Sequence, residues 1–440
     1  MFISLRCENF KCFRDTGMLE LAPITLLVGE NNSGKSSIMQ ALHLPALTLQ
    51  SEDPGVCLKL LHQDYDYGSF EDLVFRHNKK ESLTLSFKAE FLLGEKREHL
   101  QATLRLTYGY LPKRKEIYLS KLVIEDSEGE RLNIYQGKYS DSRKVLIRNY
   151  NNESPHLSRL FVRDRIVFMP RLDPFDMSKH LQKKYGKKKG TALFEEIALN
   201  ARLSYGFISL FRKVHYLGPI RVPASRTYLH TGELTDRVGR RGEQALQIYS
   251  ALLKRKKRED LKKLESIKEA LYQLGFIEKL TIRKIETRHY EFWTRHKESA
   301  LDANLADTGF GTSQVLPVIV SLYTLPPGST LLFEQPEIHL HPAGQAELGS
   351  VFAKACTPEK RIVIETHSEN LILRIQTEVA KGNLKPEFVR IYYIQPKKTG
   401  HEVVLIPLNK KGEFMTEWPK GFFEENYQES LKLSKARRGG

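Results

Sequence analysis

The stretch that decides the fold reads Gly29-Glu-Asn-Asn-Ser-Gly-Lys-Ser-Ser37. It fits the GxxxxGK[ST] pattern of a phosphate-binding loop, the Walker A motif. The apolar run at residues 24–28 predicts a buried strand before the loop, and the helical spacing of residues 36–44 predicts a helix after it. Pro45 is expected to end that helix. A full motif between a strand and a helix predicts a nucleotide-binding P-loop.

The residue types of this Walker A loop suit phosphates and a magnesium ion. Gly29 and Gly34 let the backbone curl so that N–H groups point at phosphate oxygens, and the start of the next helix adds a positive field. Lys35 would place its charge on the β and γ phosphates, and the Ser36 hydroxyl would ligate Mg²⁺. The other residues expected to bind nucleotide here are Asn32, Ser33 and Ser37. ATP and Mg²⁺ are therefore the predicted cofactors.

The bulk composition predicts a folded protein with more than one lobe. The chain has 440 residues, 40% hydrophobic and 10% aromatic, which is enough for a sizeable core. Its start lacks the features of a signal peptide, and the longest apolar run, at residues 315–325, is short and contains Pro317. We expect a cytoplasmic protein without a membrane segment. The 4 cysteines form no CxxC pair and no zinc-ligand spacing, so reduced thiols are expected.

The charge balance favours a polyanionic partner such as DNA. The net charge is +16, and neutralising phosphates with basic side chains releases counterions. The alternative is that the basic clusters are ordinary solvated faces of helices and loops. The clusters are Lys183 with Lys184, residues 187–189, Arg240 with Arg241, residues 254–258 and residues 435–438.

Hydrophobic periodicity predicts a nucleotide-binding core formed by both ends of the chain. Residues 1–13 indicate a strand and a turn, and the two-residue alternation of residues 83–135 indicates antiparallel strands. Short buried strands that alternate with helices between residues 330 and 394 indicate a mostly parallel sheet. Residues 140–190 are polar and predicted to be irregular, and helices are expected at 191–211 and 243–274. The predicted parts are an N-terminal lobe at 1–140, a mainly helical insertion at 141–295, a C-terminal lobe at 296–410 and a tail at 411–440.

Three segments of the C-terminal half carry further candidate residues. The first, Asp307-Thr-Gly-Phe-Gly-Thr-Ser-Gln314, precedes an apolar helical stretch. Gly309 and Gly311 allow close backbone approach, and Ser313 at a helix start would help to hold a γ-phosphate. Read alone, the segment is also compatible with an ordinary capped helix.

The second and third segments each begin with a predicted buried strand. Leu331-Leu-Phe-Glu-Gln-Pro-Glu-Ile-His-Leu-His-Pro342 places Glu334 at a strand end, where it would orient the water shell of Mg²⁺. Ile362-Val-Ile-Glu-Thr-His-Ser368 places His367 after the other strand, where a lone histidine would more often be structural. Its match to a switch histidine, which would contact the γ-phosphate and the attacking water, is part of the resemblance described next. His339 and His341 lack a third ligand nearby, so we expect them to shape the loop rather than bind metal.

This order of motifs resembles the bacterial AAA/ABC-type ATPases of the SMC, RecF and OLD-like group. The three segments resemble their degenerate signature loop, their Walker B strand and their switch histidine. Asn9-Phe-Lys-Cys-Phe13 resembles their N-terminal strand and turn, whose basic residue, here Lys11, approaches the nucleotide. Segments that resemble one subgroup, often defence-associated, are Tyr216-Leu-Gly-Pro-Ile-Arg221, Val238-Gly-Arg-Arg-Gly-Glu243 and Trp418-Pro-Lys-Gly-Phe-Phe-Glu424.

The resemblance implies an α/β fold, an ABC-type P-loop ATPase head with a mixed sheet, an antiparallel β lobe and a helical insertion. It also implies a homodimer or higher homo-oligomer, in which the Walker A loop of one chain meets residues 307–314 of another across ATP. Such relatives act on DNA in repair or anti-phage defence. The residues after His367 show no acidic metal cluster, so a separate effector subunit such as a nuclease is expected.

One departure from the motif concerns catalysis. In the usual Walker B motif a second acid acts as base or positions water, but here Glu334 is followed by Gln335, which cannot accept a proton. Glu337 is a candidate replacement base. Slow turnover and a long-lived ATP-bound dimer are therefore predicted. The alternatives are a scaffold that binds ATP without hydrolysing it and, less favoured by the split head, a transporter ATPase.

Overall fold

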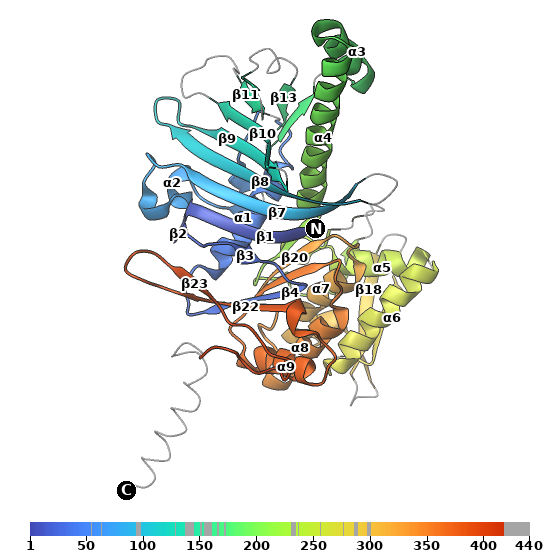
Figure 1. Cartoon of the computed structure of the whole chain (residues 1–440). Helices are drawn as coiled ribbons and strands as arrows, with labels where there is room; N and C mark the ends of the chain where they lie inside the picture. Colours follow the sequence, from blue (N-terminus) through green and yellow to red (C-terminus); the bar gives the residue numbers. More distant parts are fainter. Residues whose placement is uncertain are drawn as a thin grey trace, which may run out of the picture. The chain divides into compact units, whose positions relative to one another are not determined.

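The computed structural model describes residues 1–53, 55–62, 64–93, 98–127, 129–136, 145–149, 152–153, 161–164, 167–170, 173–229, 235, 237–255, 257–275, 277–285, 289–296 and 301–417. The chain forms two compact units (Figure 1). Unit 1 comprises Met1–Leu21, Ser36–Val214 and Pro396–Glu402, and unit 2 comprises Ala22–Lys35, His215–Gln395 and Val403–Gly440. Both units combine segments that lie far apart in the sequence. The division of the chain into four consecutive parts stays a prediction.

Unit 1 is built on an antiparallel sheet, as the alternating residues 83–135 predict. Among the described residues, 9 strands pair in the order β12-β11-β10-β9-β8-β7-β1-β2, with β3 beside β1 (Figure 1). Alternate side chains such as Leu85 and Phe87 are fully buried, which explains the two-residue period. The strands are β1 (Phe2–Phe10), β2 (Phe13–Asp15), β3 (Leu19–Glu20), β7 (Leu83–Leu93), β8 (Glu98–Leu111), β9 (Glu116–Asp126), β10 (Gly129–Gln136), β11 (Val145–Asn149) and β12 (Asn152–Glu153).

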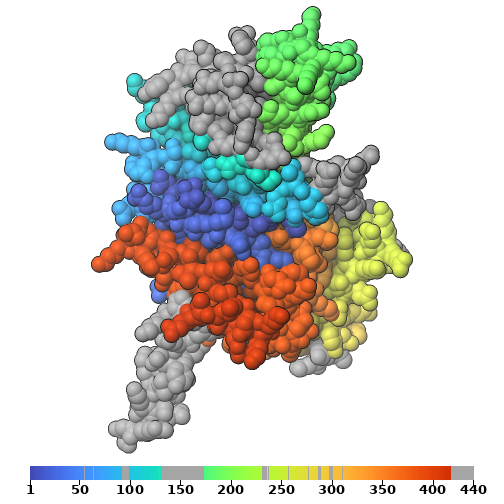
Figure 2. Space-filling model, in the orientation of Figure 1, coloured from blue at the N-terminus to red at the C-terminus, as the bar shows by residue number. Residues whose placement is uncertain are grey.

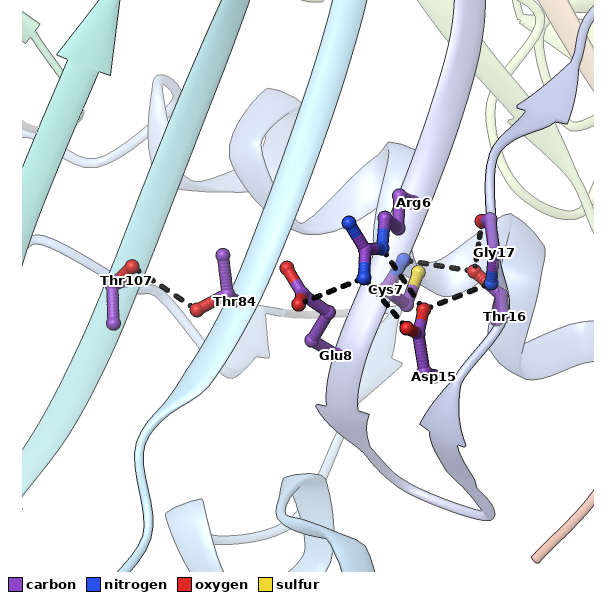
Figure 3. A network of polar contacts seen from close by, with 8 residues as sticks. All are labelled: Arg6, Cys7, Glu8, Asp15, Thr16, Gly17, Thr84 and Thr107. Carbon is purple, nitrogen blue, oxygen red and sulfur yellow. Dashed lines mark hydrogen bonds and ion pairs between the residues drawn. The ribbon is translucent and has the colours of Figure 1, made fainter.

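A polar network fixes the β1–β2 hairpin, which carries Lys11 in its turn (Figure 3). The Arg6 guanidinium donates to both carboxylate oxygens of Asp15 at 3.0 and 2.6 Å and also pairs with Glu8. The hydrogen bond from Arg6 holds the pKa of Asp15 below its usual value. The backbone N–H of Cys7 donates to the Thr16 hydroxyl at 2.9 Å. These contacts lock the register of the hairpin and so fix the position of the turn at its end.

The helices of unit 1 correct two predictions. Helix α1 (Lys35–Thr48) does not end at Pro45 but continues past it. The burial of Leu44 and Leu47 offsets the missing N–H of the proline, and Leu49 N still donates to the Pro45 carbonyl at 3.0 Å. The region predicted to be irregular contains α3 (Pro174–Tyr185), whose N-cap Asp173 accepts hydrogen bonds from Phe175 N and Asp176 N. The remaining elements are α2 (Phe70–Leu73), α4 (Lys187–Arg212), β5 (Leu61–His62), β6 (Tyr65–Asp66), β13 (Phe161–Asp164), β14 (Val167–Pro170) and the short turn η1 (Phe75–His77).

Unit 2 contains the mostly parallel sheet predicted from the two ends of the chain. Its 6 strands, all among the described residues, have the order β15-β20-β21-β4-β22-β23. β20 is parallel to β21, and both β21 and β22 are parallel to β4. The strands are β4 (Ile24–Gly29), β15 (Val214–Leu217), β20 (Thr330–Glu334), β21 (Arg361–Glu365), β22 (Val389–Gln395) and β23 (Glu402–Leu405). Every residue of β4, β20 and β21 is buried, which is typical of a central parallel strand.

Helices and a small antiparallel sheet complete unit 2, and their apolar faces share one core with the parallel sheet. The helices are α5 (Ala245–Arg255), α6 (Arg258–Gln273), α7 (Phe310–Thr324), α8 (Pro342–Ala355) and α9 (Glu369–Ala380). The small sheet contains β16 (Tyr228–Leu229), β17 (Lys279–Lys284), β18 (His289–Arg295) and β19 (Asp302–Asn304), and the short turns are η3 (Leu305–Asp307) and η4 (Pro386–Phe388). No helix of the described part of the chain is both long and apolar enough to cross a membrane. The 4 cysteines are free thiols.

Candidate nucleotide site

The Walker A loop runs from the end of β4 to the start of α1, as predicted. Gly29 has a φ of 143°, Asn32 63° and Gly34 98°, so the loop curls through backbone conformations that favour glycine or asparagine. A Cβ on Gly29 would lie 2.3 Å from the carbonyl oxygen of Ile394 in neighbouring β22. Only glycine therefore fits the point where the strand turns into the loop. Ser33 is buried, and Ser36 and Ser37 are half-buried in the first turn of α1.

Lys35 folds back over its own loop. Its side chain is 3% exposed, and Nζ donates to the carbonyl oxygens of Gly29 at 3.1 Å and Glu30 at 2.6 Å. Burial lowers the pKa of Lys35, and the negative charges of Glu365 and Glu30 oppose that shift. A cation held inside a curled loop of backbone N–H groups is the arrangement that binds the phosphates of a nucleotide.

Two buried carboxylates lie at the ends of adjacent strands in the same sheet. Glu334 ends β20, Glu365 ends β21, and the two residues are directly paired in register. They are 8% and 6% exposed. The Tyr216 hydroxyl in β15 donates a hydrogen bond to Oε1 of Glu334. Glu365 lies within the segment that the sequence singles out, but its charge facing Lys35 was not predicted.

His367 lies just beyond β21, where the sequence places the switch histidine. It is half-buried, and burial together with the positive charge of Lys35 lowers its pKa. A lowered pKa keeps the imidazole neutral at pH 7, so it can accept a proton or a hydrogen bond. His367 and Lys35 follow two neighbouring parallel strands, β21 and β4.

Gln335 and Glu337 lie in the loop that follows β20. Gln335 has a φ of 42°, and its N–H donates to the Glu365 carbonyl at 2.8 Å. Glu337 is 5% exposed, and Oε1 accepts hydrogen bonds from the Thr366 hydroxyl at 2.6 Å and from His367 N at 3.0 Å. Burial raises the pKa of Glu337 despite those bonds. The carboxyl is engaged with the histidine loop, and its role as a replacement base stays a prediction.

The signature segment caps and begins α7. The Asp307 carboxylate receives a bidentate ion pair from Arg226 at 2.6 and 3.0 Å. Gly309 is the N-cap, so Gly311 and Ser313 are the second and fourth residues of the helix rather than its cap. Ser313 is 9% exposed and lines a pocket together with Tyr228 and Pro317.

The two segments of unit 2 that resemble one bacterial subgroup pack against these motifs. In the first, Tyr216 contacts Glu334, as described, and Arg221 donates hydrogen bonds to the backbone at Gln314, Glu334 and Gln335. In the second, Gly242 has a φ of 76°, and a Cβ there would lie 2.4 Å from Cγ of Pro317 in α7. The sequence singles out both segments, but no local pattern assigns them these contacts. The third segment, residues 418–424, lies outside the described residues, as does the basic tail at 435–438.

Lys11 lies in unit 1, in the turn between β1 and β2. Its φ is 51°, its N–H donates to the Leu73 carbonyl at 2.7 Å, and Nζ lies 5.9 Å from the centre of the Tyr67 ring. Burial lowers the pKa of its ammonium group. Next to it, a hydrogen bond with Ser37 counteracts the rise that burial causes in the pKa of Cys12. The turn thus lies against the beginning of α1, next to the Walker A loop in the chain.

The two histidines after β20 have local roles in the loop. His339 has a φ of 67°, and His341 is the N-cap of α8, where its Nδ1 accepts a hydrogen bond from Ala343 N at 3.4 Å. Across the described ranges, no three or more His, Cys, Asp or Glu side chains gather as a metal site. Mg²⁺ bound with a nucleotide does not need such a cage, because phosphates and water supply most of its ligands. The assignment of Ser36 and Glu334 as ligands of Mg²⁺ stays a prediction.

The comparisons with known proteins agree with the P-loop reading. A family model described as "AAA domain, putative AbiEii toxin, Type IV TA system" matches residues 24–374. A second family model, described as "Protein of unknown function (DUF3696)", matches residues 384–433. No curated protein matches the chain.

The solved structures that match include heads of SMC proteins. An SMC head bound to the C-winged helix domain of ScpA is 12% identical, has a TM-score of 0.45, and the match covers 93% of this chain and 98% of that one. The SMC head domain from Thermotoga maritima is 12% identical, with a TM-score of 0.39 and coverages of 93% and 99%. An Smc head with an extended coiled coil, bound to the C-terminal domain of ScpA derived from Pyrococcus furiosus, is 11% identical, with a TM-score of 0.42 and coverages of 99% and 99%. The predicted α/β fold, with a mostly parallel sheet and a separate antiparallel sheet, is confirmed by the structure, and the family model confirms an AAA-type domain. Its assignment to the ABC type stays a prediction.

Proposed function

We propose that this chain, which belongs to the AAA family whose model spans residues 24–374, binds ATP with Mg²⁺ in its Walker A loop and hydrolyses it slowly. The observation that carries the proposal is the placement of Lys35 in the loop after β4 and of Glu365 and His367 at the end of β21, its parallel neighbour. Ligands bind at the carboxyl ends of strands in such sheets. Lys35 and the loop N–H groups would hold the phosphates, while Ser36 and Glu334 would hold Mg²⁺, which stabilises charge on the phosphate oxygens.

Slow hydrolysis follows from the residues that would face the attacking water. Gln335 can hydrogen-bond water through its amide but cannot take a proton, and the Glu337 carboxyl is engaged by Thr366 and His367. Neutral His367 and the Gln335 amide are then the groups at this edge that would position the water. Positioning supports phosphoryl transfer, but the loss of a general base lowers the rate. If the rate of hydrolysis were zero, the chain would be a scaffold that binds ATP without hydrolysing it.

ATP is proposed to join two copies of the chain. The signature segment would meet the nucleotide of another copy, with Gly311 and Ser313 in the first turns of α7 close to its γ-phosphate. The test is binding of a fluorescent ATP analogue, together with light scattering after size exclusion with and without MgATP. The wild type should bind and double in mass, and Lys35→Ala should do neither. Equal binding by both proteins would refute the assignment of the loop.

A polyanion such as DNA is the proposed partner outside the nucleotide site, and the α3–α4 hairpin supports it. Gly186, with a φ of 82°, joins the two helices, and lysines lie on both sides of it. The hairpin presents its surface to solvent (Figure 2). Lys183, Lys187, Lys188 and Lys189 are exposed, and none forms an ion pair within the described part of the chain. Crowded like charges at one tip repel each other, and phosphates would relieve that repulsion.

The hairpin offers a matched test of this partner. Lys187→Glu with Lys188→Glu should weaken binding of a labelled DNA duplex about tenfold or more and flatten its dependence on salt. Lys113→Glu with Lys115→Glu changes the net charge equally, at an exposed turn of the same unit. If both double variants weaken binding equally, the hairpin is not the site and only net charge matters.

The biological setting proposed from the sequence is a DNA-linked system of repair or anti-phage defence with a separate effector subunit. The support is the resemblance of the motifs to OLD- and RecF-like ATPases, and the family description refers to a toxin of a type IV TA system. Co-purification of the tagged chain with the product of a neighbouring gene, with and without ATP, tests this setting. A chain that retains all activity alone would argue against an effector.

A further inference from the structure

A buried arginine that no motif assigns lies behind the candidate site in unit 2. Arg221 is 2% exposed, and its guanidinium donates to the carbonyl oxygens of Gln314 at 3.1 Å, Glu334 at 3.1 Å and Gln335 at 3.2 Å. The first carbonyl belongs to α7 and the other two to the end of β20 and the residue after it. One rigid, planar group thus binds the signature helix and the Walker B strand together.

The charge of Arg221 is balanced by buried carboxylates. Burial lowers its pKa to about 10, and the negative charges of Glu337 and Glu334 oppose that shift. Arg221 therefore remains a cation at neutral pH. Nε of Arg221 and Oε2 of Glu337 are buried and find no hydrogen-bond partner among the described residues, so their mutual attraction must offset part of the cost of burial.

Glu337 extends the connection to a third motif. Its Oε1 accepts hydrogen bonds from the Thr366 hydroxyl at 2.6 Å and from the backbone N–H of His367 at 3.0 Å. The loop that Arg221 holds at Gln335 is thereby bound to the histidine loop two residues later, at Glu337. The atoms bound by the two residues lie in three segments: the start of α7, the end of β20 and the residues after β21.

We propose that Arg221 and Glu337 form a clasp that positions the signature helix, the Walker B end and the switch histidine as one body. This inference rests on the proposed function, because those three segments surround the nucleotide only if the chain binds it. The clasp acts through protein groups of the three segments, so both residues are positioning residues. It predicts that movement of α7 is transmitted to Gln335 and His367.

The groups that Arg221 and Glu337 bind indicate that these two residues position the motifs and do not simply fill the core. A buried ion pair contributes little net stability compared with apolar side chains of similar volume. Here, however, five polar groups of the motifs are paired by two side chains: three carbonyls, one hydroxyl and one N–H. Tyr216, five positions before Arg221, binds the Glu334 carboxylate as well. The 216–221 segment therefore holds both the backbone and the side chain of the Walker B glutamate.

The experiment compares Arg221→Lys with the wild type by hydrogen–deuterium exchange of the full chain without nucleotide. Lysine keeps the charge but cannot span α7 and β20, since its ammonium lacks the planar fork. Exchange should rise about tenfold at residues 310–317 and 334–340, where hydrogen bonds to the guanidinium are lost. It should rise with them at residues 366–370, because Glu337, in the loop that Arg221 releases, binds Thr366 and His367. Arg226→Lys is the matched control, since Arg226 makes an exposed ion pair in the same unit.

A second readout separates positioning from a general loss of structure. With MgATP, Arg221→Lys should lower kcat about tenfold or more while ATP binding changes less than about threefold, because the Walker A loop is not part of the clasp. Glu337→Gln keeps an acceptor for Thr366 and His367 but removes the charge. Hydrogen–deuterium exchange should rise at residues 310–317 and 334–340 but not at residues 366–370. This variant still tests the clasp if Arg221→Lys folds poorly.

Two results would overturn the clasp. Exchange that rises in only one of the three windows means that the motifs are not joined. Exchange that Arg221→Lys changes no more than Arg226→Lys means that the guanidinium fork does not hold them. A wild type that neither binds nor hydrolyses ATP refutes the proposed function instead, and the exchange windows still decide the clasp.

Discussion

Lys35 and Arg221 are both buried cations that donate to backbone carbonyls, yet they differ in how far apart in the sequence their partners lie. Lys35 binds the carbonyls of Gly29 and Glu30, a few positions away in its own loop. The partners of Arg221 lie 93, 113 and 114 positions further along the chain. The first cation belongs to a local motif that a sequence pattern encodes completely. The second belongs to an arrangement that only the folded chain creates.

The largest expected effects concern ATP binding for Lys35 and the free energy of unfolding for Arg221. Lys35→Met should weaken ATP binding by more than about 100-fold, because the phosphates lose their cation, with little loss of stability. Arg221→Met should cost about 3–5 kcal/mol in the free energy of unfolding, because it leaves buried Glu337 uncompensated. Urea unfolding and titration with a fluorescent ATP analogue measure the two effects.

The double variant Arg221→Met with Glu337→Met controls this experiment. Removing both charges should restore part of the stability that Arg221→Met loses, because position 337 no longer carries an uncompensated buried charge, while the polar groups that both residues bind stay unpaired. Equal losses of stability from Lys35→Met and Arg221→Met would contradict the distinction between the two cations.

The same contrast explains which elements the sequence predicts. β4, β20, β21 and β22 are continuous apolar runs, and the structure confirms a mostly parallel sheet at those positions. The prediction that α1 ends at Pro45 was wrong because tertiary burial outweighs the helix-breaking effect of one proline. The helix α3 was missed although Asp173 and Pro174 are a good N-terminal cap, because its exposed face is strongly basic.

The candidate site divides in a similar way. Lys35, Glu334 and His367 each follow a recognisable strand, so their positions could be predicted from periodicity and motif order. Arg221 and Glu365 could not be given roles, because their importance depends on charges brought near them by the fold. The resemblance of residues 216–221 to other proteins was a usable signal, but it carries no physical meaning until Glu334 is seen beside Tyr216.

Gln335→Glu tests whether the missing general base after Glu334 limits the rate of hydrolysis. A glutamate directly after Glu334 would supply a general base, a contribution of about 10²-fold or more, so the steady-state ATPase rate should rise accordingly. The ATP-linked dimer should become shorter-lived. Glu337→Ala should not produce such a rise, because its carboxyl holds the histidine loop rather than water. An unchanged rate in Gln335→Glu would show that the side chain at position 335 does not face the attacking water.

Tyr216→Phe tests the smaller, indirect contribution of the 216–221 segment. The Glu334 carboxylate loses one donor, so kcat should fall about five- to tenfold while ATP binding stays within about twofold. Tyr249→Phe is a matched control, since Tyr249 is fully buried in the same unit and its hydroxyl has no hydrogen-bond partner among the described residues. If both variants lower kcat equally, the hydroxyl of Tyr216 has no specific role.

The smallest expected effect is a pH dependence set by His367. Its pKa lies below the ordinary value of 6.5, because burial and the charge of Lys35 disfavour the protonated ring. The neutral ring is the competent form, so kcat should decline on the acid side as the ring takes up a proton, with a midpoint below pH 6.5. His367→Gln should turn over more slowly and lose this acid limb. An acid limb centred above pH 6.5, or one that persists in His367→Gln, would assign the titration to another group and separate the histidine from the Walker A lysine.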